Sequence, residues 1–185
     1  MSRNLFFLIF LGLFIISCKG PEARRPLQQT SGTFINKSIE RNKKIYELDK
    51  ARIFELMDSN PMQSYIVSNS GFWYYYNTKD TLAYLTPKFG DQVTFTYDIK
   101  ELDGNTILSE NELGLQKYII DQTQQELISG IRDGIKLMKQ GETITFLFSS
   151  YKAFGYYGIE NKLGTNVPIQ STVTLKSINK NQENQ

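Results

Sequence analysis

The 185-residue sequence contains no histidine and a single cysteine. Without histidine, the chain lacks the usual base that activates a serine or cysteine nucleophile, and it also lacks the commonest metal ligand. One cysteine excludes an intramolecular disulfide. The sequence has no CxxC pair, no P-loop and no dinucleotide-binding fingerprint. We therefore expect neither a metal nor a cofactor. The sequence also lacks the residues that hydrolases and nucleotide-driven enzymes usually need.

The charge is nearly balanced, with 21 Lys and Arg against 19 Asp and Glu, a net charge of +2. Hydrophobic residues make up 40% of the chain. These values are typical of one ordinary globular domain with extensions. They do not indicate a surface for nucleic acid or another polyanion.

The N-terminus carries a secretory signal: Arg3 precedes an apolar run from Leu5 to Ile16. The run is too short for a typical membrane-spanning helix. The sequence Ile15-Ile16-Ser17-Cys18 has the order of a lipobox, after which bacterial lipoproteins are cleaved and lipidated. It predicts a signal peptide over 1–17 and lipidation at Cys18, with plain secretion as the alternative. Acyl chains would hold the mature chain on a membrane that it does not cross.

Composition divides the rest of the chain into four segments. The polar stretch with Pro and Gly predicts a flexible tether, and a charged amphipathic stretch predicts a helix at about Ser38 to Ser59 that Asn60-Pro61 ends. Its charges are either a solvated face or a docking surface. The helix places four apolar residues on one stripe: Ile45, Leu48, Ile53 and Leu56. The expected boundaries are 18–36 for the tether, 37–61 for the helix, 62–178 for the domain and 179–185 for a frayed polar tail.

Several stretches have the composition of strands. The run Phe72 to Tyr76 is aromatic, which favours core and edge packing over binding of bases or sugars. Apolar residues alternate from Val93 to Ile99, and Asp103-Gly104 then signals a tight turn. The chain from Leu113 to Thr123 has no clear pattern.

The stretch from Glu126 to Gly155 organises the domain. Gly130 and Gly134 lie one helical turn apart and would let another backbone approach closely. Gly141 is expected to end this helix, and the period then changes to that of a strand. The apolar residues at helical spacing are Leu127, Ile128, Ile131, Ile135 and Met138, and those at strand spacing are Ile144, Phe146 and Phe148.

The motif ELISG-x-x-x-G-x-x-x-M-x-x-GE, followed by an apolar strand and YKAFG, resembles the FKBP-type peptidyl-prolyl cis-trans isomerases. The resemblance runs from Phe89 to Ile178. Together with the lipid signal, the stretches NSGFWYYY and SSYKAFGYYG are similar to the gliding-motility-associated isomerase lipoproteins of gliding bacteria. The resemblance implies an α+β fold, a bent antiparallel β-sheet wrapped around a short α-helix, here with an N-terminal helical extension.

The resemblance also implies an apolar site for a substrate proline. The backbone of Leu127-Ile128 would meet the bound peptide, and Ile131 stands where the family often has a tryptophan. Spacing alone favours a core role for these residues over a binding one. The implied site residues are Tyr97, Ile107, Tyr118, Leu127, Ile128, Ile131, Phe154, Val167 and Leu175.

Three departures from the family pattern bear on activity. Phe154 replaces a tyrosine whose hydroxyl donates to the peptide, Leu108 stands where many members have aspartate, and the loop Tyr156 to Asn166 is longer. The first hypothesis is therefore a lipid-anchored isomerase that assists folding of exported envelope or gliding-motility proteins. The second is a non-catalytic FKBP-like peptide-binding chaperone or structural lipoprotein. Either is expected to be a monomer in the outer membrane, facing the periplasm, with proline-containing segments of exported proteins as partners.

Overall fold

A computed structural model describes residues 31–81, 85–122 and 127–181. The predicted signal peptide, Cys18 and the tether up to residue 30 lie outside these ranges. The chain divides into two units, Met1–Lys37 and Ser38–Gln185, and the sheet and core described below belong to the second. None of the helices in the described ranges has the length and apolar character needed to cross a membrane.

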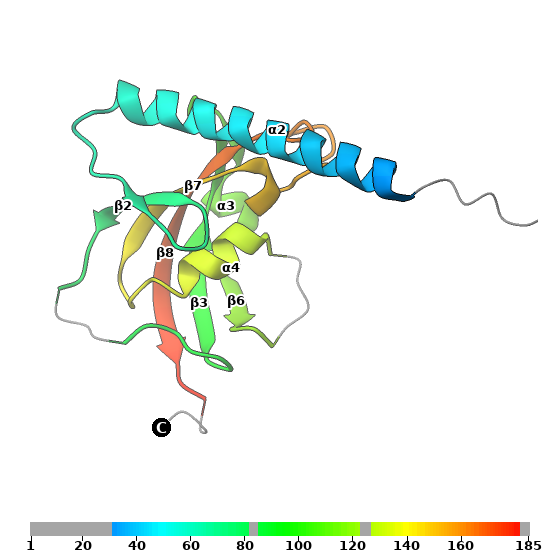
Figure 1. The fold of residues 1–185 in the computed structure, drawn as a ribbon. Coiled ribbons are helices and arrows are strands. Elements are labelled where there is room, and N and C mark those ends of the chain that lie inside the picture. The colour runs from blue at the N-terminus through cyan, green and yellow to red at the C-terminus, as the bar shows by residue number, and fades with distance from the viewer. Residues whose placement is uncertain (1–30, 82–84, 123–126, 182–185) are drawn as a thin grey trace, which may run out of the picture. The chain divides into compact units, whose positions relative to one another are not determined.

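The second unit is built on one eight-stranded antiparallel sheet (Figure 1). Its main path runs β1-β2-β7-β8-β3-β6, and the β4–β5 hairpin joins it through β8. The α+β class and the antiparallel sheet predicted from the sequence are confirmed. The strands are β1 Ile66–Val67, β2 Trp73–Thr78, β3 Gln92–Tyr97, β4 Ile99–Glu101, β5 Thr106–Leu108, β6 Gln116–Ile119, β7 Thr143–Phe148 and β8 Ile169–Asn179.

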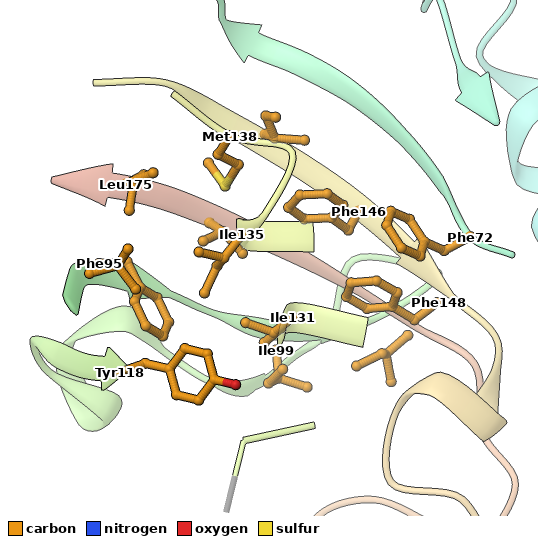
Figure 2. Close-up of a cluster of buried hydrophobic side chains, with 14 of the residues drawn as sticks. Phe72, Phe95, Ile99, Tyr118, Ile131, Ile135, Met138, Phe146, Phe148 and Leu175 are labelled. Carbon is orange, nitrogen blue, oxygen red and sulfur yellow. The ribbon is translucent and has the colours of Figure 1, made fainter. Parts of the chain in front are cut away.

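Helix α4, Ser129–Ile135, packs on one face of this sheet (Figures 1 and 2). Ile131 and Ile135 are fully buried against the alternate residues of β7 that the sequence assigned to the core. The two helix glycines lie where a side chain would collide with the sheet. A Cβ on Gly130 would lie 2.6 Å from the Phe148 ring, and one on Gly134 would lie 2.9 Å from the Phe146 ring. The predicted close approach exists, but mainly aromatic rings make it.

Helix α4 is much shorter than the sequence predicted. The expected helix reached Gly141, whereas α4 ends at Ile135. Beyond it, two N–H groups bond three residues back: Leu137 to Gly134 at 3.0 Å and Met138 to Ile135 at 3.0 Å. Its first turn also has no side-chain cap. Two glycines within seven residues lower the helix propensity, so the helix depends on packing for its stability. It therefore forms only where this segment contacts the sheet.

Helix α2, Ser31–Ser59, begins earlier than the expected start at about Ser38, so residues 31–36 are helical and not tether. Its buried side contacts the opposite face of β7 from α4. Ile53 is fully buried with Trp73 and Leu147, so β7 is covered on both faces. Leu48 does not join the predicted stripe, because its side chain is 55% exposed.

A buried acid takes part in the contact of α2 with the sheet. Asp49 is 2% exposed, and its Oδ2 accepts hydrogen bonds from the Ser150 N–H at 2.8 Å and the Ser150 hydroxyl at 2.6 Å. Ser150 begins the short 3-10 helix η1, Ser150–Lys152, directly after β7. This contact fixes α2 against the segment that follows β7.

The polar tail begins later than expected. Strand β8 continues to Asn179, and the next two residues are held by the buried carboxylate of Asp91. Lys180 Nζ donates to Asp91 Oδ2 at 2.8 Å, and the Asn181 N–H donates to Oδ1 at 3.0 Å. The polar composition of the tail predicted fraying from residue 179, whereas a buried acid 90 residues away anchors its start.

Candidate functional site

The nine residues predicted to surround a substrate proline all belong to one hydrophobic cluster, the main core. Cys18, the predicted lipidation residue, lies outside the described ranges. Burial divides the nine into two groups. Tyr118, Ile131 and Leu175 are at most 6% exposed, so they can only support a site from beneath. The half-buried residues, which present apolar surface to solvent, are Tyr97, Ile107, Leu127, Ile128, Phe154 and Val167.

The three buried residues come from different elements (Figure 2). Tyr118 lies on β6, with its ring directed toward Ile131 of α4, and its hydroxyl accepts from the Asp121 N–H at 3.3 Å. Leu175 lies toward Met138, away from Ile131, and its carbonyl accepts from the Gly141 N–H at 2.7 Å. Leu175 is therefore a core residue beyond the carboxyl end of α4, while Ile131 and Tyr118 underlie the half-exposed group.

Tyr97 is positioned by a break between β3 and β4. The next residue, Asp98, leaves the ladder, and its Oδ1 accepts from the Thr172 N–H at 2.7 Å while its carbonyl accepts from the Ser171 hydroxyl at 2.6 Å. Tyr97 packs beside Phe95, with 5.8 Å between ring centroids. Burial raises the pKa of the Tyr97 hydroxyl. That hydroxyl has no hydrogen-bond partner among the described residues, so it remains a donor.

Leu127 lies at a bend, and Ile128 then enters α4 in an extended conformation. Ile128 is the residue before the first helical turn, with φ −58° and ψ 146°. Its carbonyl accepts from the Arg132 N–H at 3.2 Å, but its own N–H has no partner in the described part of the chain. An unpaired backbone donor beside apolar side chains can bind a peptide carbonyl.

Phe154 and Val167 lie at the two ends of the loop Tyr156 to Asn166. The Asn166 N–H donates to the Gly155 carbonyl at 2.7 Å, which ties these ends together. Both side chains are half-buried against the core. Phe154 presents a ring without a hydroxyl, so this position contributes shape and no hydrogen bond. Ile107 and Leu108, both half-buried, reach the same cluster from β5.

Sequence reasoning missed two residues that shape this loop. Ile159 and Leu163 form an isolated β-bridge, with reciprocal N–H to carbonyl bonds of 2.9 Å, and both pack on the core. The longer loop is thus folded on the domain. Helix α3, Glu110–Leu113, and strand β6 were also missed, although Ser109-x-x-Glu112 has the spacing of a capping box.

That capping box leads to a prediction about pH. The Ser109 N–H and hydroxyl each donate to Glu112 Oε2 at 2.8 Å, and Lys162 of the loop lies 3.2 Å from Oε1. These interactions, the Ser109 backbone bond first, lower the pKa of Glu112 to about 2. A lowered pKa means that the contact is fully present above the ordinary glutamate pKa of 4.5 and is lost as the pH falls through about 2.

We therefore expect an NMR titration of the Glu112 carboxyl to have its midpoint near pH 2. In Lys162→Ala the midpoint should rise but stay below 4.5, because the Ser109 bonds remain. A midpoint of 4.5 in the unmodified protein would mean that neither the cap nor the contact between α3 and the loop forms in solution.

Comparison with known proteins identifies the family. Residues 84–176, half of the chain, match the model of the FKBP-type peptidyl-prolyl cis-trans isomerase family. The chain belongs to this family. All the half-buried residues of the predicted site lie within the matched range.

Solved structures share the FKBP fold. The chain is similar to a peptidyl-prolyl cis-trans isomerase from Pseudomonas syringae pv. tomato, with a TM-score of 0.59 and 16% identity, over 75% of this chain and 96% of that one. It is also similar to FkpA from Escherichia coli, with a TM-score of 0.54 and 17% identity, over 97% of this chain and 83% of that one.

Two curated relatives have a different name. Fatty acyl-CoA reductase 2 from Bos taurus is 29% identical over 105 residues, and its Homo sapiens counterpart is 28% identical over the same length. Each match covers 55% of this FKBP-family chain, and the chain spans only 19% of the length of those proteins. We assign no reductase activity, because the match covers so small a part of those proteins.

Proposed function

We propose that this protein is an active peptidyl-prolyl cis-trans isomerase whose site is the half-buried apolar group around Ile128. The observation that carries the proposal is the combination of six partly exposed apolar side chains with an Ile128 N–H, at the start of α4, that is unpaired among the described residues. The family match supports the reaction type. The chemistry needs no nucleophile, base, metal or cofactor.

The reaction is rotation about the X-Pro amide, whose barrier is about 18–20 kcal/mol because the bond has partial double-bond character. The planar amide is more dipolar than the twisted one. Contact with apolar surface therefore disfavours the planar ground state more than the twisted transition state. The Ile128 N–H can hold a flanking carbonyl in place, and the Tyr97 hydroxyl can supply a second donor where Phe154 supplies none.

A proline-limited refolding assay tests this proposal. Uncatalysed exchange takes tens to hundreds of seconds, so acceleration by micromolar amounts of the purified protein is easily measured. The proposal requires a rate that rises in proportion to protein concentration. An unchanged slow phase at micromolar protein would refute catalysis.

One observation favours a second function, that of a non-catalytic peptide-binding chaperone or structural lipoprotein. Phe154 provides no hydroxyl and Leu108 no carboxylate, so polar anchoring of a twisted amide is weaker than the family pattern supplies. One neutral hydrogen bond contributes about 0.5–1.5 kcal/mol. A non-catalytic module would bind a proline peptide in an anisotropy titration and yet leave its cis/trans exchange rate unchanged.

The proposed setting is the outer membrane, facing the periplasm. The lipobox supports an anchor at Cys18, and the sequence similarity to gliding-motility lipoproteins supports exported envelope or motility proteins as the source of proline-containing substrates. We propose that the protein acts there as a monomer.

Mass spectrometry of the natively produced N-terminal peptide tests the anchor, since an unmodified Cys18 or an uncleaved signal would contradict it. A dimer mass in sedimentation would contradict the monomer.

A further inference from the structure

A recess of about 440 Å³ lies outside the predicted proline site and is lined by residues of α2 and of the segment after β7. Three of its nine lining residues are tyrosines. Tyr46 contributes from α2, and Tyr151 and Tyr156 contribute from the segment after β7, where they are 81% and 71% exposed. We call this recess the tyrosine groove. Its lining includes Ile45, Tyr46, Asp49, Tyr151, Tyr156 and Asn166.

Both walls of the tyrosine groove are held by hydrogen bonds. Asp49 of the α2 wall accepts both the N–H and the hydroxyl of Ser150, which begins the other wall. The Gly155 N–H donates to the Ser150 carbonyl at 2.9 Å, and the Asn166 N–H donates to the Gly155 carbonyl at 2.7 Å. The groove is thus formed before any ligand arrives, and preorganisation lowers the entropic cost of binding.

The tyrosine groove is adjacent to the proposed proline site in the chain. Phe154 of that site lies between Tyr151 and Tyr156 of the groove, and Val167 of that site directly follows Asn166. One short segment therefore supplies side chains to both places. Because an extended chain advances about 3.3 Å per residue, a polypeptide with its proline at Phe154 reaches the groove within a few residues.

We propose that the tyrosine groove binds the polypeptide segment that flanks the isomerised proline. This inference rests on the proposed isomerase function. The lining fits such a segment: tyrosine rings offer flat apolar faces and hydroxyls, Asn166 offers an amide, and the one buried charge, Asp49, is already engaged by Ser150. Aromatic-lined grooves of this kind bind extended or polyproline II chains, and the volume is within the range of binding sites.

The test compares substrates of two lengths with two matched variants. Exchange is measured for an X-Pro tetrapeptide and for a twelve-residue peptide that contains the same four residues at its centre. Tyr156→Ser removes a groove residue. Tyr157→Ser is the control, because Tyr157 is the neighbouring tyrosine, is 90% exposed and does not line the groove.

We expect Tyr156→Ser to lower kcat/KM for the long peptide roughly fivefold, the size of one aromatic contact. It should leave the tetrapeptide unchanged, and Tyr157→Ser should change neither. Equal losses for both peptides, or no loss for either, would overturn the inference. So would equal effects of the two variants.

A binding measurement separates this inference from the proposed function. If the unmodified protein binds the labelled long peptide but turns over neither peptide, the isomerase proposal fails; the groove is then supported only if Tyr156→Ser weakens binding and Tyr157→Ser does not. A photo-crosslinking benzoylphenylalanine at position 151 of the full chain identifies the occupant. Crosslinks to the long peptide support the inference, whereas crosslinks only to the chain's own residues 1–30, or only to a second copy, overturn it.

Discussion

Replacing Ile128 with aspartate is expected to reduce kcat/KM for X-Pro isomerisation by at least about 100-fold, which corresponds to about 2.7 kcal/mol of transition-state stabilisation. Ile128 is half-buried on the apolar cluster, and a carboxylate there would keep its hydration shell beside the substrate amide. The backbone N–H of residue 128 is unchanged by this substitution. The loss therefore measures the apolar surface itself.

Leu137→Asp is the matched control. Leu137 is 38% exposed just beyond α4, so the same change from an apolar to a charged side chain occurs on the same structural segment but outside the predicted site. Lys44→Ala on α2 is a second control, far from the site in the chain. Both should retain activity. Equal losses in Ile128→Asp and Leu137→Asp would mean that we have placed the site wrongly, and thermal melts of all three variants would show whether any has simply unfolded.

Strands were the most predictable part of this fold. The alternation from Val93 to Ile99 became β3 and β4, and Asp103-Gly104 became the turn of the β4–β5 hairpin, with Gly104 at φ 95°. Strand patterns are visible in sequence because each side chain's face is set by a period of two. Strand β6 was missed because its pairing with β3 is dictated by position in the sheet and not by its own composition.

Helix boundaries were predicted less well. The apolar residues from Leu127 to Met138 fit a continuous helical stripe, yet only Ser129–Ile135 is helical. Leu127, Ile128 and Met138 still pack on the core, so the burial pattern is correct while the backbone is not helical there. A periodic pattern reports which side chains are buried, and non-helical turns can bury them too.

The candidate site was also predictable only in part. Family resemblance brought nine residues together, and all nine lie on one core cluster. It did not separate the half-exposed Ile128 from the fully buried Leu175, because exposure depends on which elements cover a residue. The tyrosine groove was not foreseen either. It needs Asp49 and Ser150, 101 residues apart, to meet, and neither residue alone signals the contact.

The second large effect concerns the glycines of α4. We expect Gly130→Ala to destabilise the domain by about 2–3 kcal/mol, more than the roughly 1 kcal/mol by which alanine favours a helix. The new Cβ would lie 2.6 Å and 2.7 Å from two atoms of the Phe148 ring and 2.9 Å from the Lys152 carbonyl oxygen. Urea unfolding monitored by circular dichroism measures the change. A stabilised Gly130→Ala variant would contradict the close packing of α4 on β7.

Gly134 allows a sharper experiment, because its obstacle is only the far end of one side chain. A Cβ there would meet Phe146 at Cε1 and Cζ, both at 2.9 Å. Leucine lacks those atoms, so Phe146→Leu should relieve the clash. The double variant Gly134→Ala/Phe146→Leu should therefore lose at least about 1 kcal/mol less stability than the sum of the losses in the two single variants. The pair Gly130→Ala/Phe148→Leu should show less relief, since the Lys152 carbonyl belongs to the backbone and remains in place. Strict additivity in both pairs would mean that contact with the phenylalanine rings is not the reason why these positions require glycine.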